Sequence, residues 1–366
     1  MKLRFLFLLL YLVQAAFCQS STTSPPGNIA TYSIVAWDSL TGDLGVAVQS
    51  KFLGVGAVVP YAKAGVGAIA TQAFANTTYG PEGLKFLEQG LDARRVVETL
   101  IAADSGANRR QLGVIDAQGK SFSYTGALCQ AYAGHITGNG YTVQGNILAG
   151  EAVLTAMART FEVTNGNLAD RLVAALDAGE RAGGDRRGRQ SAALLVVRDG
   201  GGYAGMSDRM IDIRVDDDSL PLVELRRIYG LWQSTFLNDA QLRSVEMFNK
   251  KKNFVAARAV LQQVVLSLNT QLRDHPDDPD VLNSVAWTLA TNNIDNVRAL
   301  ELAKRAATLS PKDNRILDTL AECHFRAGNL DAAIAIEAEL VTKEPSNDEY
   351  WKQLQKFKDA KQKAGQ

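Results

Sequence analysis

Thr31 is the residue whose type and position could do chemistry most directly, because it opens a β-type segment after a Ser-, Thr- and Pro-rich stretch. A threonine hydroxyl alone is a poor nucleophile at neutral pH, but a free α-amine, with a pKa of about 7.7–8.0, can accept its proton. Cleavage between Ala30 and Thr31 would therefore place nucleophile and base on one residue, a known variant of catalytic pairing. The alternative is that Thr31 is only a β-former at the start of a strand.

Two lysines compete to support Thr31. A buried ammonium close to Thr31 would lower the pKa of its amine and hydroxyl. Lys63 lies between predicted strands, and Lys51 follows Ser50, whose hydroxyl could orient the amine. We predict Lys63 as the catalytic lysine, and a solvated loop lysine is the competing interpretation.

A site that cleaves amides also needs hydrogen-bond donors for the oxyanion that forms on the attacked carbonyl. Asn146, at a predicted strand-to-helix junction, could supply its side-chain N–H, and backbone amides near Gly65 or Gly67 could supply others. We predict Asn146 as a catalytic residue, with a capping or turn role as the alternative.

A charged loop before the predicted strand at 192–197 could bind the substrate. Arginines in this loop could hold a carboxylate through paired hydrogen bonds, and a solvated charged loop is the competing interpretation. A histidine in a Gly-rich stretch could face the same cleft or be structural. The predicted substrate-binding residues are Asp185, Arg187, Arg189 and His135.

Other chemistries lack their residue patterns. The three histidines, His135, His275 and His324, show no His-x-x-x-His spacing, and no Cys-x-x-Cys pair occurs, so we expect no metal site. Gly65 and Gly67 imitate a dinucleotide loop but precede no predicted helix, so we expect no cofactor. Lys plus Arg and Asp plus Glu number 39 each, and this balance argues against nucleic acid as a partner.

The first thirty residues resemble a targeting region. Lys2 and Arg4 precede a nine-residue apolar run, and small residues follow, which is typical of a secretory signal peptide at 1–18. Residues 19–30 are predicted to be a disordered pro-segment. No later segment is apolar enough to span a membrane, so we expect a secreted or periplasmic protein without stable membrane insertion.

The elements that must position Thr31 lie in residues 31–215. Their patterns run in the order strands, two helices, strands, two helices, strands. A doubly wound fold would need strand and helix to alternate one by one. Two packed sheets with helices outside, a four-layer αββα sandwich, satisfy this order, so we predict an α+β fold.

A second, all-helical domain is predicted at 222–363, after a charged linker at 216–221 that ends in proline. Small and apolar residues recur at 34 or 35 positions between about 280 and 345, and this period resembles the tetratricopeptide repeat. A plain helical bundle is the alternative. Such repeats present a groove that binds a protein or peptide partner. The sequence is also compatible with a homo-oligomer.

Six motifs in the first domain resemble an uncharacterised family known as domain of unknown function 1028, which is similar to the Ntn hydrolases. They lie at 31–36, 42–53, 64–72, 79–83, 140–148 and 184–193. The resemblance implies an Ntn-hydrolase-like αββα fold and amide hydrolysis. The interval from Thr31 to Lys63 is also similar to that of the active-site lysine in proteasome β subunits.

Two functional hypotheses follow. The first is an exported amidohydrolase that cuts a C–N bond of a small amide or peptide with Thr31 as nucleophile and its α-amine as base. It requires removal of residues 19–30 by a protease or by autoproteolysis at Ala30–Thr31. The second is a non-catalytic exported binding protein that acts through its helical repeats.

Overall fold

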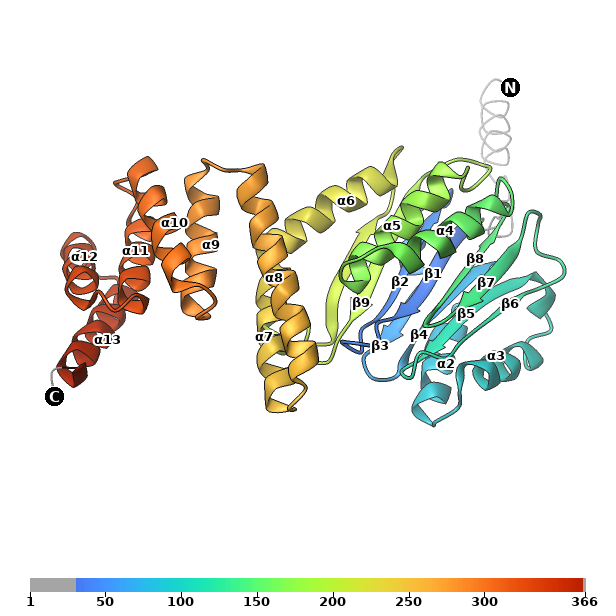
Figure 1. The fold of residues 1–366 in the computed structure, drawn as a ribbon. Helices are drawn as coiled ribbons and strands as arrows, with labels where there is room; N and C mark the ends of the chain where they lie inside the picture. The colour runs from blue at the N-terminus through green and yellow to red at the C-terminus, as the bar shows by residue number, and fades with distance from the viewer. Residues whose placement is uncertain (1–30, 365–366) are drawn as a thin grey trace, which may run out of the picture.

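The computed structural model describes residues 31–364, in which ten strands and a series of helices follow one another (Figure 1). The predicted signal peptide at 1–18 and pro-segment at 19–30 lie outside the described residues. The strands are β1 (Thr31–Trp37), β2 (Leu44–Ser50), β3 (Pro60–Lys63), β4 (Gly67–Ala73), β5 (Arg110–Asp116), β6 (Ser121–Thr125), β7 (Gly134–Gly138), β8 (Tyr141–Asn146), β9 (Ser191–Val197) and β10 (Arg209–Val215). The helices up to α6 are α2 (Tyr79–Glu88), α3 (Ala93–Ala102), α4 (Ala152–Val163), α5 (Leu168–Arg181) and α6 (Pro221–Trp232).

The strands form two antiparallel sheets. The six-stranded sheet has the order β10-β9-β2-β1-β8-β7, and the four-stranded sheet has the order β3-β4-β5-β6. The tight turn between β1 and β2 explains why these strands pair. Asp38 Oδ1 accepts hydrogen bonds from the backbone N–H groups of Leu40 and Thr41, and Gly42 adopts φ +78°. β1 therefore lies inside its sheet, between β2 and β8.

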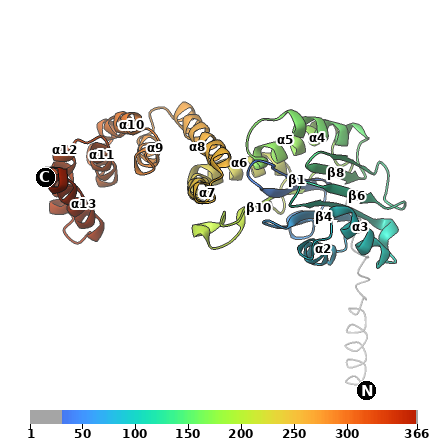
Figure 2. The ribbon, with the colours of Figure 1, turned by 60° about the horizontal axis from the view of Figure 1, so that its bottom comes forward.

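The two sheets face each other, and helices cover both outer faces (Figure 2). Along β1, Tyr32 and Ile34 point into the apolar core beneath α4 and α5, while Val35 points into the core between the sheets. Helices α2 and α3 cover the outer face of the four-stranded sheet. The prediction of a mixed α+β domain is therefore confirmed. Side chains alternate between the two faces of β1, and this alternation decides which of its residues lie between the sheets.

Helix α6 extends the core of the sheet domain. Leu222, Leu225 and Tyr229 are buried in the same apolar cluster as residues of β9 and β10. The exposed segment at 216–220 therefore joins a strand and a helix that pack on each other. The predicted boundary at 216–221 stays a prediction.

The described residues from 233 to 364 form helices joined by short turns, as predicted. A π-helical segment, Gln233–Leu237, leads into α7 (Asn238–Lys250), α8 (Phe254–Asp274), α9 (Pro279–Thr291), α10 (Asn296–Leu309), α11 (Asn314–Arg326), α12 (Leu330–Lys343) and α13 (Asp348–Ala364). Consecutive helices pack as hairpins that extend away from the sheets (Figure 1). Ala286, Ala299, Ala321 and Ala333 are fully buried, because small side chains let the helix axes approach closely.

Two carboxyl groups, the buried one of Glu337 and the half-buried one of Asp318, lie where α11, α12 and α13 meet. Burial, and then the charge of Asp318, raise the pKa of Glu337 to about 8, and burial raises the pKa of Asp318 to about 6. Gln353 donates a hydrogen bond to Asp318, and the neighbouring Glu322 pairs with Lys356. The folded helices therefore favour the protonated form of Glu337 at neutral pH.

We expect this helical region to lose stability as the pH rises. Between pH 4.5 and 8 the unfolded chain releases a proton that folded Glu337 retains, so the free energy of unfolding falls, by about 2–4 kcal/mol. Glu337→Gln should remove most of this slope in thermal melts from pH 5 to pH 8. Glu339→Gln, on the exposed side of α12, is the matched control. An unchanged slope in Glu337→Gln would refute the assignment.

Candidate functional site

Thr31 lies at the start of β1 with two polar neighbours in adjacent strands. In the register of the sheet, Thr31 is opposite Ser50 of β2 and Asn146 of β8. Residues opposite each other carry their side chains on the same face, which here is the face turned toward the four-stranded sheet. Thr31 Oγ1 donates to Ser50 Oγ at 3.2 Å, and all three residues are buried. The structure thus brings the predicted nucleophile and Asn146 together.

Three buried glutamines connect the two sheets beside Thr31. Gln72 Nε2, from β4, donates to the Thr31 carbonyl at 3.3 Å and to Gln111 Oε1 of β5 at 2.7 Å. Gln144 Nε2, from β8, donates to Ser33 Oγ at 2.6 Å, and Ser33 Oγ donates to Gln72 Oε1 at 2.6 Å. These bonds position the first residues of β1 against the second sheet.

The same network holds the side chain of Asn146. Its Nδ2 donates to Gln111 Oε1 at 3.2 Å, and Gln111 Nε2 donates to the Gly145 carbonyl at 2.8 Å. None of the three glutamines was predicted from the sequence. The available signal was one glutamine in each of three strands that are rich in apolar and small residues, because a buried amide must find partners inside the protein.

Two of the five non-glycine residues with positive φ among residues 31–364 lie at this end of the sheets. Ala73, directly after Gln72, has φ +67°, and Ile147, directly after Asn146, has φ +52°. Positive φ is costly for residues with a Cβ, and most costly for a β-branched one. Both residues line a small pocket together with Asn146. Strain of this kind clusters at functional sites, so this end of the sheets is the candidate site.

The predicted substrate-binding loop lies against the same end. Asp185 Oδ2 accepts a hydrogen bond from the Lys51 backbone N–H at 2.9 Å, and the Arg186 N–H donates to the Ile147 carbonyl at 3.0 Å. Asp185 is buried and also pairs with Arg187, with Nη2 and Oδ2 3.0 Å apart. Asp185 therefore shapes the loop, and Arg187, one-third exposed, is the member of this pair that could meet a ligand.

Arg189 is held on the outer side of the loop. Its guanidinium pairs with Glu180 of α5, and Glu180 also accepts a hydrogen bond from the Tyr32 hydroxyl at 2.7 Å. Burial, and then the charge of Glu180, hold the pKa of Tyr32 well above its usual range. Arg189 thus belongs to an ion pair at the edge of the candidate site.

The structure does not bring Lys63 to Thr31. Lys63 ends β3 opposite Gly67, whereas Thr31 contacts Gln72 near the other end of β4. Five residues of strand separate Gly67 from Gln72, which is roughly 17 Å. Lys63 is exposed and pairs with Glu88. The backbone amides at 65–67, predicted as oxyanion donors, lie at this distant end as well.

Lys51 and His135, the remaining predicted side chains, lie at the edge of the candidate site. Lys51 Nζ donates to the Arg189 carbonyl at 3.2 Å, so its ammonium is directed to the loop. His135, exposed on β7, shares a hydrogen bond with Thr125 Oγ1 through its Nδ1 at 2.9 Å. Thr125 in turn accepts from Gln111 Nε2 at 2.9 Å. His135 is therefore linked to the buried network without contacting Thr31.

Among residues 31–364, no group of three or more His, Cys, Asp or Glu side chains is arranged to hold a metal ion. In the same range no helix has the length and apolar character needed to cross a membrane.

The fold is a mixed α+β domain of two opposed antiparallel sheets, followed by a C-terminal region of helical hairpins. Polar residues lie at the start of β1, an inner strand. The model of the Family of unknown function (DUF1028) matches residues 31–225, more than half of the chain, and the chain belongs to this family. A tetratricopeptide-repeat model matches residues 295–356, which confirms the repeat prediction and suggests protein partners.

A solved structure supports the same assignment. The crystal structure of a protein of this family from Silicibacter pomeroyi is 31% identical and covers 57% of this chain and 92% of its own chain, with a TM-score of 0.53. No curated protein matches this chain. The family assignment predicted from the sequence motifs is therefore confirmed.

Proposed function

We propose that residues 31–215 form an Ntn-hydrolase-like αββα domain that hydrolyses a C–N amide bond, with Thr31 as nucleophile. The observation that carries this proposal is the position of Thr31. It opens an inner strand, and its side chain lies between Ser50 and Asn146 on the face between the sheets. A chain that began at Thr31 would have its α-amine and hydroxyl at one end of the polar network.

In this mechanism the α-amine of Thr31 accepts the proton of Oγ1 as Oγ1 attacks the substrate carbonyl carbon. The C–N bond then breaks, the proton passes to the leaving amine, and an ester on Oγ1 is hydrolysed by water. Ser50 Oγ, 3.2 Å from Oγ1, orients the hydroxyl. Asn146 Nδ2 has two hydrogens; one donates to Gln111, and we assign the second to the oxyanion.

The proposal includes export and maturation. Residues 1–18 direct the chain to a secreted or periplasmic location, and cleavage between Ala30 and Thr31 exposes the amine. The substrate class is a small amide or a peptide. Arg187 is the side chain best placed to meet a substrate carboxylate, because it is partly exposed beside the end of β2.

The test compares two purified forms of the protein. Intact-mass analysis of exported protein should show a chain that begins at Thr31. That form should hydrolyse compounds in a panel of N-acyl and dipeptide amides, whereas a form beginning at Gln19 should not, because an amide nitrogen cannot serve as the base. Equal activity of both forms, without trimming during the assay, would exclude the mechanism.

The tetratricopeptide-repeat match favours a second candidate function, a binding protein that acts through its helices. It predicts an exported chain that begins at Gln19 and is never shortened to Thr31. The same mass measurement therefore separates the two proposals.

A further inference from the structure

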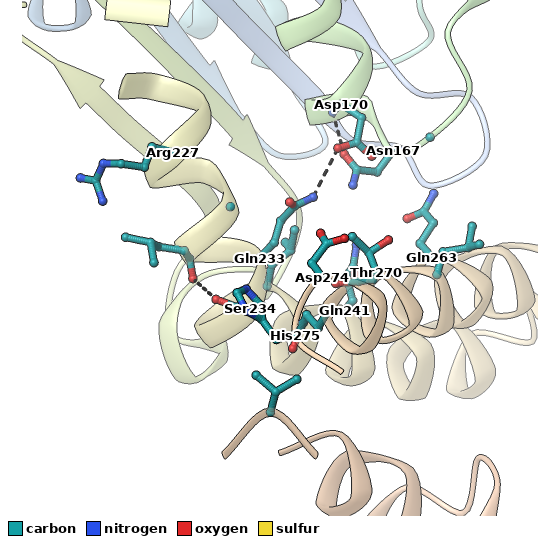
Figure 3. A pocket seen from close by; sticks show the side chains of 18 residues that line it. Asn167, Asp170, Arg227, Gln233, Ser234, Gln241, Gln263, Thr270, Asp274 and His275 are labelled. Carbon is teal, nitrogen blue, oxygen red and sulfur yellow. Dashed lines mark hydrogen bonds between the residues drawn. The ribbon is translucent and has the colours of Figure 1, made fainter. Parts of the chain in front are cut away.

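A cavity of about 660 Å³ lies between the start of α5 and helix α8, and Figure 3 shows Asn167 on its wall. Asn167 lies just before α5, whereas Glu180, near the end of α5, accepts a hydrogen bond from the Tyr32 hydroxyl. Thirteen residues of helix separate Asn167 from Glu180, which is roughly 20 Å. A substrate in this cavity would not reach Thr31, so the groups that select a substrate must lie at the small pocket that Asn146 lines.

This small pocket is built by several segments of the sheet domain. Its walls come from the ends of β4 and β8, from Arg109 directly before β5, and from the loop after β6. The Leu128 N–H of this loop donates to the Asn108 carbonyl at 2.7 Å, and the loop also accepts a hydrogen bond from the Ile147 N–H at 3.0 Å. The pocket has a volume of about 10 Å³, room for roughly one water-sized group, so most of a substrate must lie on the surface around it.

Arg109 places a positive charge on that surface. It is exposed, and its guanidinium lies 5.6 Å from the centre of the Phe74 ring. Within residues 31–364 no carboxylate forms an ion pair with Arg109, because Asp104, the acidic side chain of the preceding loop, pairs with Arg110 at 2.9 Å. The guanidinium of Arg109 is therefore available to a ligand.

The opposite edge of the site, on the six-stranded sheet, is also basic. Lys51, directly after β2, and Arg186, whose N–H donates to the Ile147 carbonyl at 3.0 Å, are exposed and have no ion pair in the described part of the chain. Arg187 shares its charge with Asp185. Basic and acidic side chains number 39 each over the whole chain, so this excess is local. A local excess of positive charge attracts an anionic ligand.

Apolar side chains lie beside Arg109. Phe74 and Leu128 line the same pocket, and Leu128 is 60% exposed. This surface thus offers an apolar contact and a cation side by side. An amino acid with an apolar side chain and a free carboxylate matches both.

The distances fit a carboxylate close to the scissile bond. Arg109 lies two residues from Gln111, roughly 7 Å along the chain, and Gln111 Oε1 accepts a hydrogen bond from Asn146 Nδ2 at 3.2 Å. In an N-acyl amino acid the carboxylate carbon lies three bonds from the acyl carbonyl carbon, within roughly 4 Å. A long arginine side chain and these three bonds together bridge the gap between Arg109 and Asn146.

We propose that Arg109 binds the carboxylate of an N-acyl amino acid with an apolar side chain, and that the amide bond of this compound is the one attacked by Thr31. The inference rests on the proposed hydrolysis at Thr31 and names its substrate class. The acyl oxygen enters the pocket beside Asn146, the apolar side chain lies on Phe74 and Leu128, and the guanidinium donates paired hydrogen bonds to the carboxylate. Attack leaves the acyl group as an ester on Oγ1 and releases the free amino acid; water then releases the acyl group as a carboxylic acid.

The test compares N-acetyl-leucine with N-(3-methylbutyl)acetamide, which has the same amide and apolar body but no carboxylate. Acetate release by protein that begins at Thr31 should show a kcat/KM at least about tenfold higher for N-acetyl-leucine. Arg109→Gln should remove this preference, chiefly by raising KM, and should leave the neutral amide unaffected because that compound has no group for the guanidinium. Arg95→Gln, at an exposed position of α3 outside the pocket, is the matched control and should behave like the wild type.

A binding measurement separates a failure of this inference from a failure of the proposed hydrolysis. Isothermal titration of Thr31→Ala protein that begins at residue 31 measures the affinity for N-acetyl-leucine without turnover, and adding Arg109→Gln should weaken it at least about tenfold. Such a loss, without acetate release by the wild type, would support the role of Arg109 and contradict hydrolysis at Thr31.

Three results would overturn the role of Arg109. They are the absence of saturable binding of N-acetyl-leucine at millimolar concentration, equal kcat/KM values for the two compounds, and a loss of binding in Arg187→Gln but not in Arg109→Gln. Equal kcat/KM values would leave the proposed hydrolysis in place, because both compounds would still be cut.

Discussion

Thr31→Ala is expected to abolish turnover by protein that begins at residue 31, with kcat reduced by a factor on the order of 10⁴ or more. Alanine has no oxygen with which to attack the carbonyl carbon, although it keeps the α-amine. Thr31→Ser should retain part of the activity, because the hydroxyl survives while the methyl group that restricts χ1 is lost. Single-turnover kinetics on the best amide of the panel measure the loss.

Folding must be shown to be intact in these variants. Thr31 Oγ1 donates to Ser50, so circular dichroism and thermal melts accompany each kinetic measurement. Thr137→Ala, at an exposed position of β7, is the matched control and should keep full activity. Full turnover by a folded Thr31→Ala protein would leave Thr31 as a structural residue.

Asp43→Asn is expected to destabilise the sheet domain by about 3–5 kcal/mol. Asp43 lies in the turn before β2, and its carboxylate receives two hydrogen bonds from Arg198, at 2.6 and 2.5 Å. The two side chains are 1% and 2% exposed. Removing the negative charge leaves a buried guanidinium without its counter-charge, which costs far more than losing a surface pair. Urea unfolding measures the change.

The control for this prediction is an exposed ion pair. Glu98→Gln removes the partner of Arg94 on α3, where both side chains are about half exposed, and should cost less than about 1 kcal/mol. Replacing both buried partners, as Asp43→Leu with Arg198→Met, should recover much of the lost stability, because no unpaired charge remains. A loss below 1 kcal/mol in Asp43→Asn would show that the pair is not needed.

Much of the fold could be predicted from local patterns. The strand that begins at Thr31 and the turn at Asp38 to Gly42 depend on residues close together in the chain, and both are present. The recurrence of alanines at 34 or 35 residues identifies the helical hairpins, because each repeat buries the same positions against its neighbours. Family motifs, compared as a set, led to the correct family.

The candidate site was predicted only in part. Asn146 lies opposite Thr31 because it ends the strand that pairs with β1, and its catalytic role stays a prediction. Lys63 lies far from Thr31, and its distance in sequence could not reveal this, because that distance does not show which end of β3 it occupies. The buried glutamines were missed, because a single polar residue in a strand does not show whether a second sheet covers it.

The sequence by itself determined the element types, the helical repeat and the family, since these follow from the neighbours of each residue and from motif order. Only the tertiary structure decided which side chains meet. The register of β1 with β2 and β8 joins Thr31 to residues 19 and 115 positions away, and the packing of the two sheets adds Gln72. Such contacts depend on many long-range pairings forming together, and no local pattern encodes them.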